Sequence, residues 1–135
     1  MSNLKILVCG SRDYTDESFM RSKLNAIVSQ LGVPANQVEV IVGGAKGADT
    51  IAERLARKWG WPVTVYKADW QAEPKRAGYL RNERMLNEGK HHVVLAFFGP
   101  SGTDSPGTSH MVDYARKRGY TGWTYRPHLN NEAVD

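Results

Sequence analysis

Short apolar runs alternate along this chain with longer segments in which apolar residues recur every three or four positions. The short runs predict buried strands at residues 4–8, 38–42, 63–66, 92–98 and 121–125. The longer segments predict helices at residues 16–31, 48–59, 78–88 and 108–117. This alternation favours an α/β fold. We expect a single-domain, Rossmann-like open parallel sheet of about five strands with helices on both faces.

Capping and breaking residues predict where the first helix begins and ends. Asp13, or Thr15 with Asp16, is suited to cap it, and Gly32 is suited to end it. Its buried stripe is expected to contain Met20, Leu24, Ile27, Val28 and Leu31. The domain is expected to span residues 1–126, and residues 127–135 are expected to form a polar, frayed tail.

Composition narrows the class of protein. With 135 residues, 41% hydrophobic and 24% charged, the chain has the size and composition of one globular domain. The net charge of +4 favours an acidic ligand but is too small to indicate nucleic acid. Cys9 is the single cysteine, which excludes an internal disulfide, and we expect it to be buried and inert.

No segment of the sequence indicates a membrane, a metal or a cofactor. The first residues lack the pattern of a signal peptide, and no apolar stretch approaches the roughly 18 residues of a membrane span. A cytoplasmic location is therefore expected. His91 and His92 do not have metal-ligand spacing to another candidate, so no metal site is predicted.

A turn that carries glycine follows each of the first four predicted strands. The first is Gly10-Ser11-Arg12, and the second runs from Gly43 to Asp49. The third connection carries Gly78 with Arg81 and Asn82, and the fourth runs from Gly99 to Thr108. In a parallel sheet these turns share the carboxyl edge, where ligands bind. Glycine and helix N-termini let the backbone approach a phosphate, so an anionic ligand, and in particular a nucleotide, is predicted.

The second turn, with the sequence GGAKGADTIAERLA, has the strongest pattern. Its glycine spacing differs from the NAD-binding fingerprint, and it lacks the Gly-Lys-Ser/Thr of a P-loop. Lys46 and the amides of Gly47 and Ala48 are candidates to contact a phosphate, while Asp49 is a candidate helix cap or ribose ligand. A tight turn without a ligand is the alternative.

Charged and aromatic residues in the other turns add weaker signals. Arg12 is suited either to clamp a phosphate or to lie solvated at the surface. Arg81 and Asn82 are expected in the first turn of a helix, where a cation opposes the dipole unless an anion is close. Trp70, in a polar loop, either packs or stacks on a base. The fourth loop either wraps a phosphate, through Gly99, Gly107 and Thr108, or has no role.

Four segments together resemble the SLOG superfamily, specifically its YspA-like branch: ILVCGSRDY, IVGGAKGADTIAERLA, AGYLRNERML and PGTSHMVDYARKRG. This superfamily joins the Lonely Guy phosphoribohydrolases with the DprA/Smf DNA-processing proteins. The resemblance implies a Rossmann-like fold and a nucleotide or nucleotide-derived ligand at the carboxyl edge of the sheet. It carries ligand contacts onto Gly10, Ser11, Gly43, Gly44, Gly47, Arg81, Gly107 and Thr108. A homodimer is an expectation by analogy, because Lonely Guy proteins assemble through helices beside the site.

One departure from the Lonely Guy pattern leaves the question of catalysis open. The last Lonely Guy motif ends in a catalytic glutamate, and Met111 stands at the corresponding place here. A thioether cannot act as an acid, a base or a charge partner. Arg81 is the candidate that remains if the chain is a hydrolase, with Asp49 or Asp104 as a substitute carboxylate.

Three functions follow from these patterns. The first is binding of a nucleotide or a nucleotide-derived small molecule, for example a signalling nucleotide, through the glycine turns with Arg12, Lys46 and Arg81. The second is N-glycoside hydrolysis of nucleoside 5′-monophosphates. The third is binding of single-stranded DNA, which is the least favoured because no basic and aromatic groove is evident.

Overall fold

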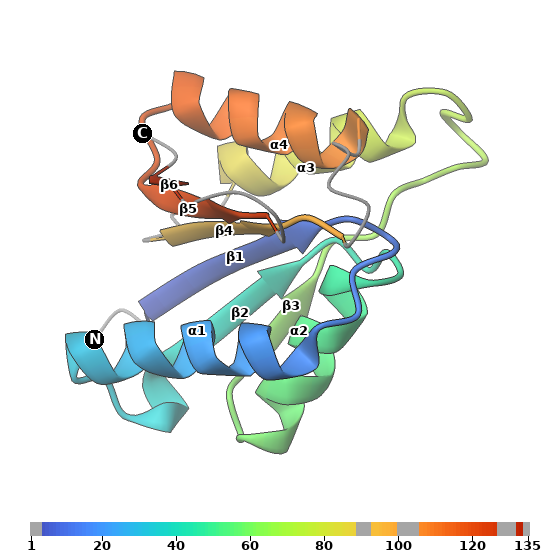
Figure 1. Ribbon diagram of the computed structural model, residues 1–135. Coiled ribbons are helices and arrows are strands. Elements are labelled where there is room, and N and C mark those ends of the chain that lie inside the picture. The colour runs from blue at the N-terminus through green and yellow to red at the C-terminus, as the bar shows by residue number, and fades with distance from the viewer. Residues whose placement is uncertain (1–3, 89–92, 100–105, 127–131, 134–135) are drawn as a thin grey trace.

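The computed structural model describes residues 4–88, 93–99, 106–126 and 132–133, and it confirms the expected α/β fold (Figure 1). Five strands run parallel, and the strand order in the sheet is β3-β2-β1-β4-β5-β6. The strands are β1 (Leu4–Gly10), β2 (Val38–Val42), β3 (Val63–Val65), β4 (Val93–Phe97), β5 (Gly122–Tyr125) and β6 (Glu132–Ala133). The helices are α1 (Glu17–Leu31), α2 (Ala48–Lys58), α3 (Ala77–Glu88), α4 (Pro106–Lys117) and a short 3₁₀ helix, η1 (Ala35–Gln37).

Helices α1 and α2 cover one face of the sheet, and α3 and α4 cover the other (Figure 1). Strand β1 serves both layers because its side chains alternate: Ile6 and Val8 join the core under α1 and α2, whereas Leu7 and Cys9 join the core under α3 and α4. From β1, which lies between β2 and β4, the chain first adds strands on one side of the sheet (β2, β3) and then on the other side (β4, β5). In a doubly wound sheet this change of side leaves a crevice at the carboxyl ends of the strands, which is where ligands bind.

Helix α1 shows what the periodicity predicts and what it does not. The Asp16 carboxylate accepts a hydrogen bond from the Phe19 amide at 3.1 Å, so Asp16 is the cap and Asp13 is not. Gly32 ends the helix in the left-handed conformation, with φ +65°. Met20 and Leu24 are buried, but the expectation for Leu31 is wrong, since it is 53% exposed. Periodicity gives the direction of a side chain, and burial also needs another element opposite it.

The boundaries of the last elements differ from the sequence prediction. Helix α4 begins at Pro106, so Gly107 and Thr108 lie in its first turn and not at the end of a loop. Proline suits the first position of a helix, because a backbone N–H at that position has no acceptor within the helix and proline lacks this N–H. The tail is not wholly frayed, because Glu132–Ala133 forms a short strand that pairs antiparallel with β5. Residues 127–131, 134 and 135 lie outside the described residues.

No helix in the described ranges has the length and apolar character that crossing a bilayer requires.

Candidate functional site

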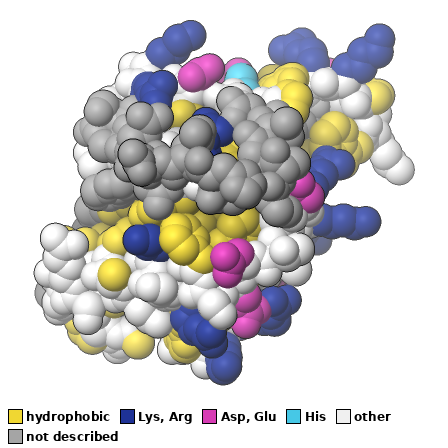
Figure 2. Space-filling view, viewed as in Figure 1, with side chains coloured by type: hydrophobic (Ala, Val, Ile, Leu, Met, Phe, Trp, Pro, Cys, Tyr) yellow, Lys and Arg dark blue, Asp and Glu magenta, His cyan; other side chains and the backbone are white. Residues whose placement is uncertain are grey.

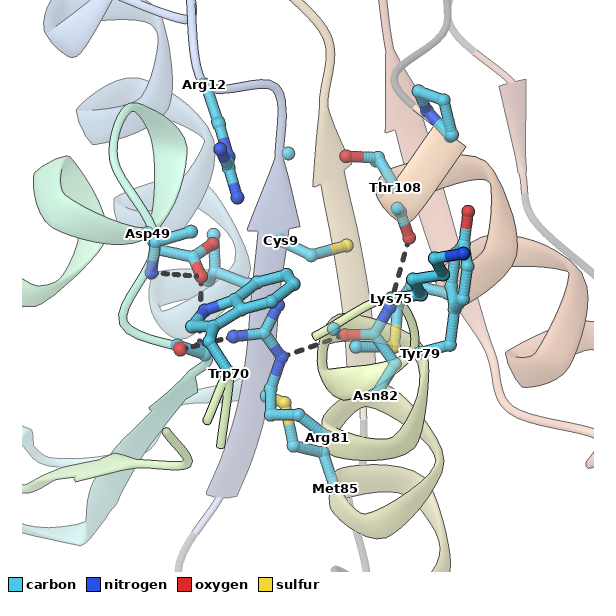
Figure 3. A pocket seen from close by; sticks show the side chains of 18 residues that line it. Cys9, Arg12, Asp49, Trp70, Lys75, Tyr79, Arg81, Asn82, Met85 and Thr108 are labelled. Carbon is cyan, nitrogen blue, oxygen red and sulfur yellow. Dashed lines mark hydrogen bonds between the residues drawn. The ribbon is translucent and has the colours of Figure 1, made fainter. Parts of the chain in front are cut away.

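A pocket of about 390 Å³ opens at the carboxyl edge of the sheet (Figure 3). Its walls come from the end of β1, the turn between β2 and α2, the segment that leads into α3, helix α3 itself and the first turns of α4. Segments far apart in the chain therefore meet at one place, as the parallel topology predicts. The predicted site residues that line it are Gly10, Arg12, Gly43, Asp49, Arg81, Asn82, Gly107 and Thr108.

The other predicted site residues do not line the pocket. They are Ser11, Gly44, Lys46, Gly47, Ala48 and Gly99. Gly44 and Lys46 are exposed, and Gly99 lies against the carboxylate of Asp13. The Ala48 amide donates to the Ser11 carbonyl oxygen at 3.3 Å. The Ser11 hydroxyl is buried, and it has no hydrogen-bond partner among the described residues.

Asp49 holds the turn between β2 and α2 together. Its Oδ2 atom accepts hydrogen bonds from the Gly43 amide at 3.1 Å and from the Ala45 amide at 3.2 Å. The predicted helix cap is therefore wrong: the residue before α2 is Gly47, and the Asp49 carboxylate binds the preceding turn instead. Because the Gly43 amide already has this acceptor, it is not free to bind a phosphate.

Gly47 brings the first and second turns into contact. Its φ of +78° and ψ of −123° belong to a region of backbone space that only glycine adopts readily. A Cβ atom at this position would overlap the carbonyl oxygen of Ser11. Gly47 is therefore needed for contact between two turns of the protein, and it does not line the pocket.

Arg81 projects from α3 toward the end of β2. Its Nη1 donates to the Gly43 carbonyl oxygen at 2.5 Å, and its Nε donates to Asn82 Oδ1 at 3.1 Å. A Cβ atom on Gly43 would lie 2.7 Å from the guanidinium carbon, so a side chain at this position would displace Arg81. Helix α3 begins at Ala77, which places Arg81 beyond the first turn and corrects the expected position.

Burial sets the electrostatics of this arginine. It lowers the pKa of the Arg81 guanidinium from its ordinary value, while the negative charge of Asp49 acts in the opposite direction. Within the described ranges, no carboxylate lies within 4.0 Å of Arg81, and its Nη2 group makes no hydrogen bond. A half-buried cation with free donors favours an anionic ligand.

Asn82 positions Arg81 and links α3 to α4. Only 4% of its surface is exposed, and its Oδ1 accepts from Arg81 Nε. Its Nδ2 donates to the Gly107 carbonyl oxygen at 3.0 Å and lies 3.4 Å from His110 Nδ1. Both polar atoms of the side chain are used within the protein. The arrangement thus positions Arg81, and the ligand contact of Asn82, which lines the pocket, stays a prediction.

Sequence reasoning missed several residues of the pocket wall, above all Cys9, Lys75 and Tyr79. Cys9 is buried, and burial raises the pKa of its thiol well above the ordinary range, which agrees with the expected inert thiol. Lys75 is exposed and makes no ion pair with a described residue. The sequence contains one indication that Lys75 belongs to the wall: it lies in a connection that reaches the same edge of the sheet.

Residues 4–72 match the model of the YspA, cpYpsA-related SLOG family. The chain belongs to this family. It is also similar to the Gene 61 protein of Mycobacterium phage D29, with 38% identity over 120 residues that cover 85% of this chain and 90% of that protein. The predicted YspA-like branch of the SLOG superfamily is confirmed.

Inside this SLOG pocket, the position of the Lonely Guy glutamate carries an apolar side chain. Met111 is 1% exposed, lines the pocket and packs in the same core cluster as Cys9 and Met85. Asp49 is the one acidic residue among the described residues of the wall, and Asp104 lies outside the described ranges. Burial raises the pKa of Asp49 from 3.8 to about 6, against the opposing effects of the two amides and Arg81.

This pKa predicts how stability depends on pH. Between about pH 4 and pH 6 the folded protein holds a proton on Asp49 that the unfolded chain has lost, so raising the pH across this range destabilises the fold. Asp49→Asn removes the titrating group. We expect its free energy of unfolding to rise relative to wild type by on the order of 2 kcal/mol from pH 4 to pH 6, and the difference to stay constant above about pH 7. Urea unfolding at pH 4.0–7.5 measures this, and a difference that does not vary with pH contradicts it.

Proposed function

We propose that this protein binds a nucleotide or a nucleotide-derived small molecule in the pocket at the carboxyl edge of the sheet. The observation that carries the proposal is Arg81, which is held in place by Gly43 and Asn82 and has free donors in the pocket. Arg12 and Lys75 add two more cations to the wall, against the carboxylate of Asp49, the one acidic side chain among its described residues. The volume of about 390 Å³ lies within the range of small-molecule sites.

The start of α4 supports a phosphate at one end of this ligand. Pro106, Gly107 and Thr108 form the first turn of α4, and all three line the pocket. The dipole of a helix places partial positive charge at its first turn. This charge stabilises a bound anion.

Binding is tested by thermal shift and isothermal titration calorimetry with nucleoside mono- and diphosphates, ADP-ribose and cyclic nucleotides. A ligand at about 100 times its dissociation constant adds roughly 2.7 kcal/mol of stability, which raises Tm by several degrees in a domain of this size. We expect a saturable shift that is selective for particular nucleotides. The absence of binding at millimolar concentration across the panel would overturn the proposal.

The second candidate is an N-glycoside hydrolase, and the pKa of Asp49 is the observation that favours it. A carboxyl group with a pKa of about 6 is suited to general acid catalysis near neutral pH, and this one lies in the wall of the pocket with Arg81. The hydrolase predicts release of free base from a nucleoside 5′-monophosphate, measured by chromatography, and loss of that release in Asp49→Asn. If the wild type binds a monophosphate and releases no base, the protein is a binding module.

Single-stranded DNA binding has no comparable support. On the face shown in Figure 2, the Lys and Arg side chains of the described residues are scattered and do not form a continuous band. A strand of DNA is held by a basic groove with interleaved aromatic side chains.

A further inference from the structure

Two exposed aromatic side chains lie at the wall of this pocket. Trp70 is 49% exposed and Tyr79 is 38% exposed, and both line the cavity. The remaining large hydrophobic residue that is exposed in the described part of the chain is Leu31, at the end of α1 near the amino edge of the sheet. The exposed aromatic surface is therefore concentrated where the cations are.

A hydrogen-bonded turn holds Trp70 in this position. The Asp69 carboxylate accepts a hydrogen bond from the Ala72 amide at 3.1 Å, and the Asp69 carbonyl oxygen accepts from the Glu73 amide at 3.0 Å. The Glu73 carbonyl oxygen then accepts from the Ala77 amide at 2.8 Å, which joins this turn to the start of α3. The indole is presented by local backbone structure and does not belong to either core cluster.

The indole and the Tyr79 ring are both supported by α3. The indole edge lies against Gly78, where a Cβ atom would be 3.4 Å from Trp70 Cη2. The Tyr79 ring packs on His110 with a centroid distance of 4.7 Å. In the view of Figure 3, the indole lies on the Asp49 and Arg81 side of the pocket, and Tyr79 lies on the other side, next to Lys75.

We propose that Trp70, assisted by Tyr79, is the base-recognition element of the pocket, so that the ligand is a nucleotide with an intact heterocycle and not a sugar phosphate. The inference rests on the proposed function and assigns one end of the same site. Arg81, Arg12 and the first turn of α4 supply the positive charge, and the aromatic rings supply a flat apolar surface. Every nucleobase has a π-face, so stacking on an indole stabilises the base whatever its hydrogen-bonding edge.

Ligands with and without a base test this assignment. Calorimetry would measure the four nucleoside 5′-monophosphates and ribose 5-phosphate against wild type, Trp70→Ala, Trp70→Phe and Leu31→Ala. We expect Trp70→Ala to weaken the tightest monophosphate by roughly 5- to 150-fold and to leave ribose 5-phosphate affinity unchanged. Trp70→Phe should keep most of the affinity. Leu31 is exposed and remote from the pocket, so Leu31→Ala should leave the affinities for the monophosphate and for ribose 5-phosphate unchanged.

The outcomes separate this inference from the proposed function. If wild type binds ribose 5-phosphate as tightly as every monophosphate, or if Trp70→Ala binds the tightest monophosphate as wild type does, the base is not recognised here and the inference is wrong, while the anion pocket stands. If wild type binds none of the five compounds, the proposed function fails for this ligand class and the inference fails with it. Circular dichroism and Tm check that Trp70→Ala is folded, and Trp70→Phe provides the comparison if it is not.

Discussion

Arg81→Ala is expected to weaken nucleotide binding by roughly 10- to 150-fold and to leave the fold intact. Hydrogen bonds to charged groups contribute about 1.5–3 kcal/mol each, and the Nη2 group of Arg81 is free to form such bonds with a phosphate or carboxylate. The protein contacts that the substitution removes are a bond to the Gly43 carbonyl and one to the Asn82 side chain. Calorimetry with the best ligand of the panel measures the change.

Arg84→Ala is the matched control for this experiment. Arg84 lies one turn further along α3, is exposed, pairs with Glu88 at 3.6 Å and does not line the pocket. The two variants remove the same charge from the same helix, so a general effect of net charge would weaken both equally. We expect less than a twofold change for Arg84→Ala. Equal affinities of Arg81→Ala and wild type would show that the site assignment is wrong.

Gly47→Ala is expected to lower the free energy of unfolding by at least about 3 kcal/mol. The new Cβ atom would overlap the carbonyl oxygen of Ser11 and lie 2.6 Å from that of Arg12. Both are backbone atoms that cannot rotate away as a side chain can. The φ of +78° with ψ of −123° adds strain for any residue other than glycine.

Gly32→Ala separates backbone strain from steric overlap. Gly32 also has a positive φ of +65°, and no atom lies within 4 Å of the position of its missing Cβ. We expect this variant to lose only about 1 kcal/mol, the ordinary cost of a left-handed conformation. Urea unfolding of both variants measures the difference. Equal losses would mean that the contact between the turns does not constrain Gly47.

The fold was predictable because its strands are short apolar runs with clear breaks. The prediction for β2, residues 38–42, has the same boundaries in the structure. The errors occur where hydrogen bonding and not burial sets the boundary. Helix α4 begins at Pro106 within a segment of small polar residues, and β6 has only two residues, too few for any periodicity.

The candidate site was predictable as a location and only partly as a set of contacts. Four turns follow four strands, so the carboxyl edge of the sheet could be inferred from order alone. The sequence identifies which backbone groups are able to approach a ligand, but not which already have a partner in the protein. The amides of Gly43 and Ala48 are bound by Asp49 and Ser11, and Asn82 is bound by Arg81 and Gly107.

The aromatic side of the pocket had the weakest signal. Trp70 lies in a polar segment, and its orientation depends on the hydrogen bonds of Asp69, which residue type alone does not reveal. Lys75 reaches the wall because the segment before α3 crosses the end of the sheet, and Tyr79 reaches it from the first turn of α3. Such placement depends on tertiary structure and leaves no local pattern.

The strands at the two edges of the sheet limit how copies of this protein can associate. A strand at the edge of a sheet offers unpaired N–H and C=O groups, and a long, flat edge allows another chain to add a strand of its own. Here β3 has three residues, and β5 is paired with β6 at Trp123 and Thr124. In the part of the chain that the structure describes, these short outer strands leave little backbone for intermolecular pairing. This disfavours a continuous sheet across two subunits and leaves the helical faces as the surfaces for any homodimer.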